Sequence, residues 1–148
     1  MEDIVLRRAQ KEDLDEIMKM QVSVFAGEQR IPAEIIGQLP PESVQWWCAL
    51  DGAAIVGAIA AWEEEGQNHI GRFVVHPDCR GKHIGRRLVC FALDDLFSQG
   101  VEMLYMEARE VTVKIIGSLG GKVVGEPEEF YEGTVTPMTL SREDYQVK

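Results

Sequence analysis

The chain has 148 residues, 45% of them hydrophobic, and a formal net charge of −10. This length predicts one domain over residues 1–148 with a single hydrophobic core. The negative balance argues against nucleic acid or an anionic membrane as a partner, because both require a broad basic surface. Neither an apolar run of about 18 residues nor an apolar leader is present, so no transmembrane helix and no signal peptide are expected.

The cysteines point to a reducing compartment. Cys48, Cys79 and Cys90 form no CxxC motif and have no metal-ligand spacing. We therefore expect reduced thiols, no metal site and a cytoplasmic location. Cys79 lies beside Arg80, whose charge could make its thiol reactive. The alternative, an ordinary unreactive thiol, is favoured.

The first half of the chain predicts a strand, a helix, a short helix and a strand hairpin. In chain order these elements are Ile4–Ala9, Lys11–Gly27, Pro32–Gly37, Val44–Leu50 and Ala54–Trp62. Gly27 should end the first helix, and Pro32 suits the first turn of the second. Asp51-Gly52 is typical of a tight hairpin turn, and Glu63 to Asn68 reads as a polar loop.

The second half alternates strands with helices and closes with two strands. In chain order these elements are His69–Val75, Arg80–Ser98, Val101–Ala108, Glu110–Leu119, Lys122–Gly125 and Thr134–Leu140. Gly100 should stop the first of these helices, and Gly120-Gly121 should cap the second. The order predicts an α+β fold with a mixed, mostly antiparallel sheet and helices on both faces. The strand–helix–strand unit from Ile70 to Ala108 should be a right-handed parallel crossover.

The segment from Gly71 to Leu93 predicts an anion site. A buried strand runs into a turn broken by Pro77, and a helix follows. Unpaired N–H groups at a helix start, together with the helix dipole, favour a bound anion. The segment after Cys79 has no acidic residue and four basic ones, Arg80, Lys82, Arg86 and Arg87. Cations at a helix N-terminus oppose the dipole, so this cluster indicates a small polyanion; a solvated basic face is the alternative.

The same segment resembles a known family signature. VVHPDCRGKHIGRRLV is similar to the acetyl-CoA signature of the GCN5-related N-acetyltransferases (GNATs), Arg/Gln-x-x-Gly-x-Gly/Ala. The matching residues are Arg80, Gly81, Lys82, Ile84 and Gly85. VFAGEQRIP and LGGKVVGEPEEF resemble two further stretches of a branch of small, mostly uncharacterised bacterial members. The resemblance therefore covers nearly the whole chain.

The resemblance implies an acyl-CoA N-acyltransferase fold and acetyl-CoA as co-substrate. The strands His69–Val75 and Val101–Ala108 would splay apart, and pantetheine would bond the main chain of Phe73, Val74 and Val75. The pyrophosphate would lie on the N–H groups of Arg80 to Gly85, and Arg86 or Arg87 would reach the 3′-phosphate. A primary amine, of a small molecule or a protein, would attack the thioester directly in a ternary complex. Small members often pair through their last strands, so a homodimer is compatible with the resemblance.

The chain also departs from the family pattern. His83 stands where the central glycine of the signature is usual; a side chain is tolerable there in a helical conformation, but it adds bulk beside the cofactor. The tyrosine that often protonates the leaving thiolate is replaced by Ile116, and Gly121 stands where a phenylalanine is usual. Tyr105 and Tyr131 are candidate substitutes.

Two residues are the leading candidates for the base that takes the amine's proton. Glu28 lies in the VF-x-x-EQ stretch, and His69 begins the cofactor strand and titrates near neutrality. The acidic loop Glu63–Glu65 is a weaker candidate, which a solvated loop explains as well. Arg72 is either an acceptor contact or a sheet-face residue.

Two other functions stay open. An acyl-CoA-binding module or sensor with little catalysis would explain His83 and the missing tyrosine. An unrelated phosphate-binding fold is compatible with the turn, although the antiparallel hairpins disfavour it.

Overall fold

The computed structural model describes residues 4–29, 44–80, 83–131 and 133–146. Its α-helices are α1 (Leu14–Gln29), α3 (Ile84–Ser98) and α4 (Glu110–Ser118), and short 3-10 turns cover Lys11–Asp13 and Pro77–Cys79. Its strands are β1 (Ile4–Arg8), β2 (Gln45–Asp51), β3 (Ala54–Glu64), β4 (Gln67–Val75), β5 (Met103–Ala108), β6 (Lys122–Val123), β7 (Glu128–Glu129) and β8 (Thr134–Ser141). The predicted helix Pro32–Gly37 lies outside the described residues.

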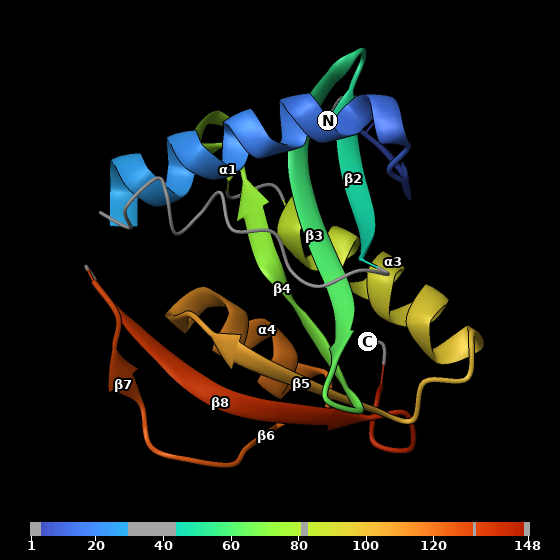
Figure 1. Ribbon diagram of the computed structural model, residues 1–148, viewed down its shortest axis with the longest axis vertical. Coiled ribbons are helices and arrows are strands. Elements are labelled where there is room, and N and C mark those ends of the chain that lie inside the picture. The colour runs from blue at the N-terminus through green and yellow to red at the C-terminus, as the bar shows by residue number, and fades with distance from the viewer. Residues whose placement is uncertain (1–3, 30–43, 81–82, 132, 147–148) are drawn as a thin grey trace.

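The strands form one mixed sheet in the order β1-β2-β3-β4-β5-β8-β6, with β7 paired to β8. Every neighbouring pair among the described strands is antiparallel except β4 and β5. Helix α1 covers one face, whereas α3 and α4 cover the other (Figure 1). This arrangement confirms the predicted α+β class with a mostly antiparallel sheet and helices on both faces.

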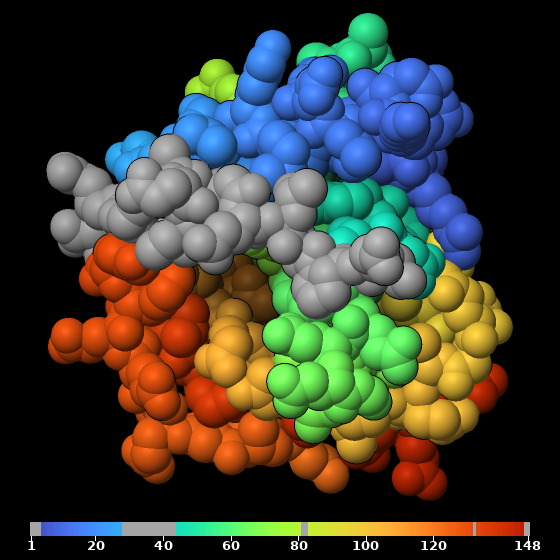
Figure 2. Space-filling view, viewed as in Figure 1, coloured from blue at the N-terminus to red at the C-terminus, as the bar shows by residue number. Residues whose placement is uncertain are grey.

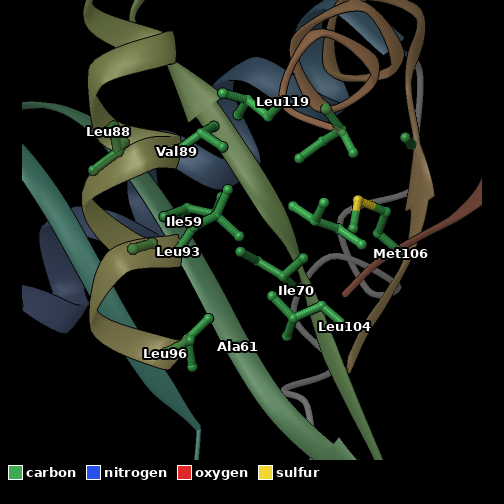
Figure 3. Close-up of a cluster of buried hydrophobic side chains, with 14 of the residues drawn as sticks. Ile59, Ala61, Ile70, Leu88, Val89, Leu93, Leu96, Leu104, Met106 and Leu119 are labelled. Atoms are coloured by element: carbon green, nitrogen blue, oxygen red, sulfur yellow. The ribbon is translucent and has the colours of Figure 1, made fainter. Parts of the chain in front are cut away.

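The larger part of the hydrophobic core lies between the sheet and α3 and α4. Helix α3 buries Leu88, Ala92 and Leu96 at helical spacing, as its sequence predicts. Figure 3 shows Val89, Leu93 and Leu96 of α3 in one buried cluster with Ile70 of β4 and Leu104 of β5, the two diverging strands. A second cluster, under α1, packs the residues Ile17, Met20, Val24, Phe25, Cys48, Ala58 and Val74. Packing on both faces fixes the register of the central strands, because a one-residue slip would move each side chain to the opposite face and out of the cluster in which it packs.

Several element boundaries differ from the prediction; for example, β5 begins at Met103 and β6 ends at Val123. Helix α1 continues past Gly27 to Gln29, because one glycine weakens a helix without ending it. The expected loop after Trp62 is a tight hairpin instead, since Glu65 and Gly66 both adopt positive φ, as two-residue turns require. Helix α3 begins at Ile84 rather than Arg80. The expected acidic loop contains the short strand β7.

Candidate functional site

The parallel pair β4–β5 opens into a gap. The two strands pair at only two positions among the described residues, Asn68 with Leu104 and His69 with Tyr105, near the start of both. From there β4 follows β3, whereas β5 follows β8. The strands therefore diverge like the arms of a V (Figure 1). This geometry agrees with the divergence that the family resemblance implies for these two strands.

A β-bulge turns β4 away from β5. Arg72 and Phe73 both lie opposite Ile59 of β3, and Arg72 adopts a left-handed backbone with φ of 56°. An extra residue of this kind bends its strand and increases the local twist. Gln21, fully buried on α1, donates from Nε2 to the carbonyl of Arg72 at 2.7 Å. Helix α1 thus supports a strained backbone beside the gap, as is common at functional sites.

A cavity of about 470 Å³ fills the gap. Its apolar lining is Phe25, Ile59, Ile70, Phe73, Val89, Met106, Ala108, Ile116, Phe130 and Val135, and its polar lining is Arg72, Glu107, Arg109, Thr112 and Glu128, with Gly71. Figure 2 shows the surface hollowed between the orange-red C-terminal strands and the green strands. An apolar cavity with a few polar groups is the usual form of a small-molecule site.

Two guanidinium groups and two carboxylates share this cavity. Burial lowers the pKa of both Arg72 and Arg109, because the charged form loses water. Glu107 accepts a hydrogen bond from the hydroxyl of Tyr105 at 2.5 Å. That bond, followed by burial and the charge of Glu107, raises the pKa of Tyr105 to about 12. Tyr105 therefore keeps its proton at neutral pH and holds Glu107 in place.

The two sequence-based candidate bases lie at different places. His69 stacks on Trp62 with ring centroids 5.7 Å apart, and its edge meets Tyr105 at 5.3 Å. The His69 side chain does not line the cavity, but its ring contacts Tyr105, whose hydroxyl donates a hydrogen bond to Glu107. Glu28 lies in the last turn of α1, and its side chain is outside the described residues.

The predicted anion turn joins β4 to α3. Arg80 donates from Nε to the carbonyl of Val75 at 3.1 Å, which ties the turn back to the end of β4. Arg86, which with Arg87 is a candidate to reach the 3′-phosphate, donates to Ser118 Oγ at 2.7 Å. Gly81 and Lys82 lie outside the described residues.

Gly85 and Ile84 begin α3 beside the cofactor strand. A Cβ at Gly85 would lie 2.9 Å from Phe73 Cζ and 3.4 Å from Val75 Cγ2. Ile84 is buried, so it contributes its main chain rather than its side chain to the turn. The glycine lets the start of α3 approach β4 closely.

The conformation of His83 corrects one expectation. The expected conformation for this residue was a helical backbone, in which a side chain is tolerated. Instead, His83 is the N-cap residue of α3 with φ of 62° and ψ of 13°, which is left-handed. A Cβ is unfavourable there by about 1–2 kcal/mol, which is why glycine suits this position of the turn.

The left-handed conformation predicts an unusual order of stability. His83→Gly should unfold with a free energy about 1 kcal/mol higher than His83→Ala. At a right-handed helical position alanine would be the more stable by a similar amount. Urea unfolding of the two variants without CoA measures the difference, and a more stable alanine variant would refute the left-handed assignment.

Ile116 is the residue at which the family resemblance leads us to expect a tyrosine. It is buried on α4 and lines the cavity, so a tyrosine there would place its hydroxyl near the gap. A side chain on Gly121 would collide with Ile116, so the two departures from the family pattern fit one another. Of the candidate substitutes, Tyr105 donates to Glu107, and Tyr131 is exposed and packs on Phe130.

Sequence reasoning missed three charged residues of the cavity: Glu107, Arg109 and Glu128. Glu107 and Arg109 share a face of the β5 end with Tyr105, since strand residues alternate. This alternate spacing could have identified Glu107 and Arg109 from the sequence. Glu128 had no such signal, because it was assigned to a loop.

The part of the chain that the structure describes contains neither a metal-binding cluster nor a membrane-spanning helix. No cluster of three or more His, Cys, Asp or Glu side chains there could hold a metal ion. No helix in these ranges has the length and apolar character that crossing a membrane requires.

Comparisons with known proteins agree with this architecture. The family model for the "Acetyltransferase (GNAT) family" matches residues 12–116. Escherichia coli ElaA superposes with a TM-score of 0.80 at 19% identity, covering 93% of this chain and 99% of that one. An acyl-CoA N-acyltransferase from Pseudomonas aeruginosa gives 0.78 at 21% identity, covering 93% and 97%. The ribosomal-protein-S18-alanine N-acetyltransferase from Escherichia coli gives 0.75 at 15% identity, covering 99% and 97%. No curated protein sequence matches the chain significantly.

Proposed function

Because the chain belongs to the GNAT family of acetyltransferases, we propose that it transfers an acetyl group from acetyl-CoA to a primary amine. Members of this family use an acyl-CoA and act on amine acceptors. The observation that supports the proposal is the cavity between the diverging strands β4 and β5, in which we place the meeting point of the two substrates. The proposal includes a single catalytic domain over residues 1–148 and a cytoplasmic location.

The cofactor-binding residues follow from the strand and the turn. We assign the pantetheine arm to the main chain of Phe73, Val74 and Val75, on the edge of β4 that turns away from β5. We assign the pyrophosphate to the main-chain N–H groups of the turn, Arg80, Gly81, Lys82, His83, Ile84 and Gly85. Arg86 would have to exchange Ser118 for a phosphate oxygen.

The acceptor amine must lose a proton to attack the thioester carbonyl. We assign the base to Glu107, the carboxylate that lines the cavity and is oriented by Tyr105. Glu28 and His69 remain alternative bases, and His69 would act through its contact with Tyr105. A main-chain N–H at Val74 or Val75 would stabilise the charge that develops on the carbonyl oxygen.

Two measurements test this function. Calorimetry should detect CoA binding, and thiol release from acetyl-CoA should rise when amines are added from a panel of amino acids, polyamines and peptides. No binding at millimolar CoA would refute the whole assignment. Binding without amine-dependent release would favour an acyl-CoA sensor, the function that His83 and Ile116 leave open.

The same assay assigns the base. Glu107→Gln should lower kcat by about a hundredfold and remove the fall in rate at acid pH, because an amide takes no proton. Glu28→Gln and His69→Gln are compared under identical conditions. If one of these two variants loses more kcat than Glu107→Gln and also loses the fall in rate at acid pH, that residue is the base instead of Glu107.

A further inference from the structure

Arg109 has an unusual environment for an arginine. It directly follows β5 and is the N-cap residue of α4, and its guanidinium lies over the ring of Phe130 at 5.1 Å. Its Nη2 atom is buried, and no hydrogen-bond partner for it exists among the described residues. Arginine side chains stay charged in proteins and can only donate. Arg109 therefore brings an unmet donor and a positive charge to the cavity wall.

Some other arginines among the described residues are neutralised by carboxylates. Arg7 pairs with Asp13 at 2.7 Å, and Arg142 pairs with Glu102 at 3.2 Å. Both of these arginines are more accessible to water, where an unpaired charge costs little. A partly buried cation without an anion is costly, and an aromatic ring replaces only part of its hydration. An arginine placed in this way is best explained by an anion that arrives with a ligand.

The surroundings of Arg109 favour the same kind of ligand. The N-terminal end of α4 borders the cavity through Arg109 and Thr112, and no side chain caps its first N–H groups. Helix N-termini stabilise negative charge. On the same wall, the carboxylate of Glu107 can receive an amine. The cavity thus offers opposite charges to the two ends of a small molecule.

We propose that the amine acceptor is a small zwitterion, an amino-acid-like molecule whose carboxylate is bound by Arg109 while its amine faces Glu107. This inference rests on the proposed function and specifies the acceptor class for it. A polycationic acceptor would instead bring like charge against Arg109. The other source of an anion is a phosphate of CoA, and the two sources give different results below.

The test uses pairs of acceptors that differ only at the carboxylate: each of the common L-amino acids and its amide. The amine of an amide is less basic and more often neutral, which by itself favours the amide. We expect the wild-type protein to prefer at least one amino acid over its amide by about tenfold or more in kcat/KM. Arg109→Met should leave CoA affinity unchanged and raise KM for the amino acid far more than KM for its amide, which removes the preference. Arg109→Lys should keep part of it. Arg142→Met, a matched loss of charge at the surface, should keep all of it.

Four results would overturn the proposal. They are no preference in the wild type, an equal loss for acid and amide in Arg109→Met, weaker CoA binding in that variant, and no binding of any amino acid to the CoA complex by calorimetry. Weaker CoA binding would assign Arg109 to a cofactor phosphate. Failure of the proposed function itself looks different: no amine of any kind then raises thiol release, while calorimetric binding still tests Arg109.

Discussion

Replacing Gly85 with glutamate is expected to weaken CoA binding by about a hundredfold or more, since steric displacement and like charge each cost several kcal/mol. A Cβ at this position would meet Phe73 Cζ at 2.9 Å, closer than packed carbon atoms lie. The ring of Phe73 would have to move toward the cavity that it lines. The carboxylate would also stand beside the N–H groups assigned to the pyrophosphate.

Gly117→Glu is the matched control for this variant. Gly117 lies on the exposed side of α4, and a Cβ there would meet nothing within 4 Å. The control adds the same charge and volume away from the turn, so CoA affinity should stay within about twofold of wild type. Calorimetric titration with CoA measures both variants after circular dichroism has confirmed their folds. A folded Gly85→Glu variant with unchanged affinity would show that the cofactor lies elsewhere.

Local signals in the sequence were enough to predict most of the fold. The alternation and length of apolar runs placed the central strands, and the stripe of Ile84, Leu88 and Ala92 placed α3 on the sheet. Glycines predicted the end of α3 and the cap of α4, where Gly120 adopts φ of 108°. These features depend on residues that are neighbours in the chain.

The details of the site depend on contacts between distant segments. The bulge at Arg72 is set by the register against β3 and by Gln21 of α1, 51 residues away, so the local sequence did not reveal it. The environment of Arg109 depends on Phe130, which directly follows β7 and places its ring against the guanidinium. The left-handed backbone of His83 was not predicted for another reason. The comparison with the signature showed that a glycine is replaced by His83, but it did not show that this position needs a left-handed backbone.

Replacing Asp95 with asparagine should lower the free energy of unfolding at pH 7 by about 2 kcal/mol, because a buried donor loses its charged acceptor. Asp95, on α3, accepts two hydrogen bonds from Arg8 at 2.6 and 2.7 Å and one from Trp47 Nε1 at 2.9 Å. Trp47 is 0% exposed, so its N–H has no access to water. Arg8 is 59% exposed, so its share of the loss is small. These bonds join β1, β2 and α3.

The pH dependence identifies the ionised carboxylate as the cause. The bonds from Arg8, and then that from Trp47, hold the pKa of Asp95 well below its usual range. A carboxyl whose pKa is lowered by folding stabilises the protein above its unfolded pKa of about 3.9 and loses this contribution as the pH falls toward its folded pKa. The difference between wild type and Asp95→Asn should therefore be full at pH 7 and should shrink below about pH 4.

Urea unfolding at pH 7 and pH 3 measures it, with Asp78→Asn as the control, because the Asp78 carboxylate is 90% exposed. If the difference in free energy of unfolding stays constant with pH, Asp95→Asn destabilises the protein through the shape of the amide rather than through the lost charge. If wild type and variant do not differ at pH 7, the Arg8–Asp95–Trp47 contact contributes nothing to holding α3 on the sheet.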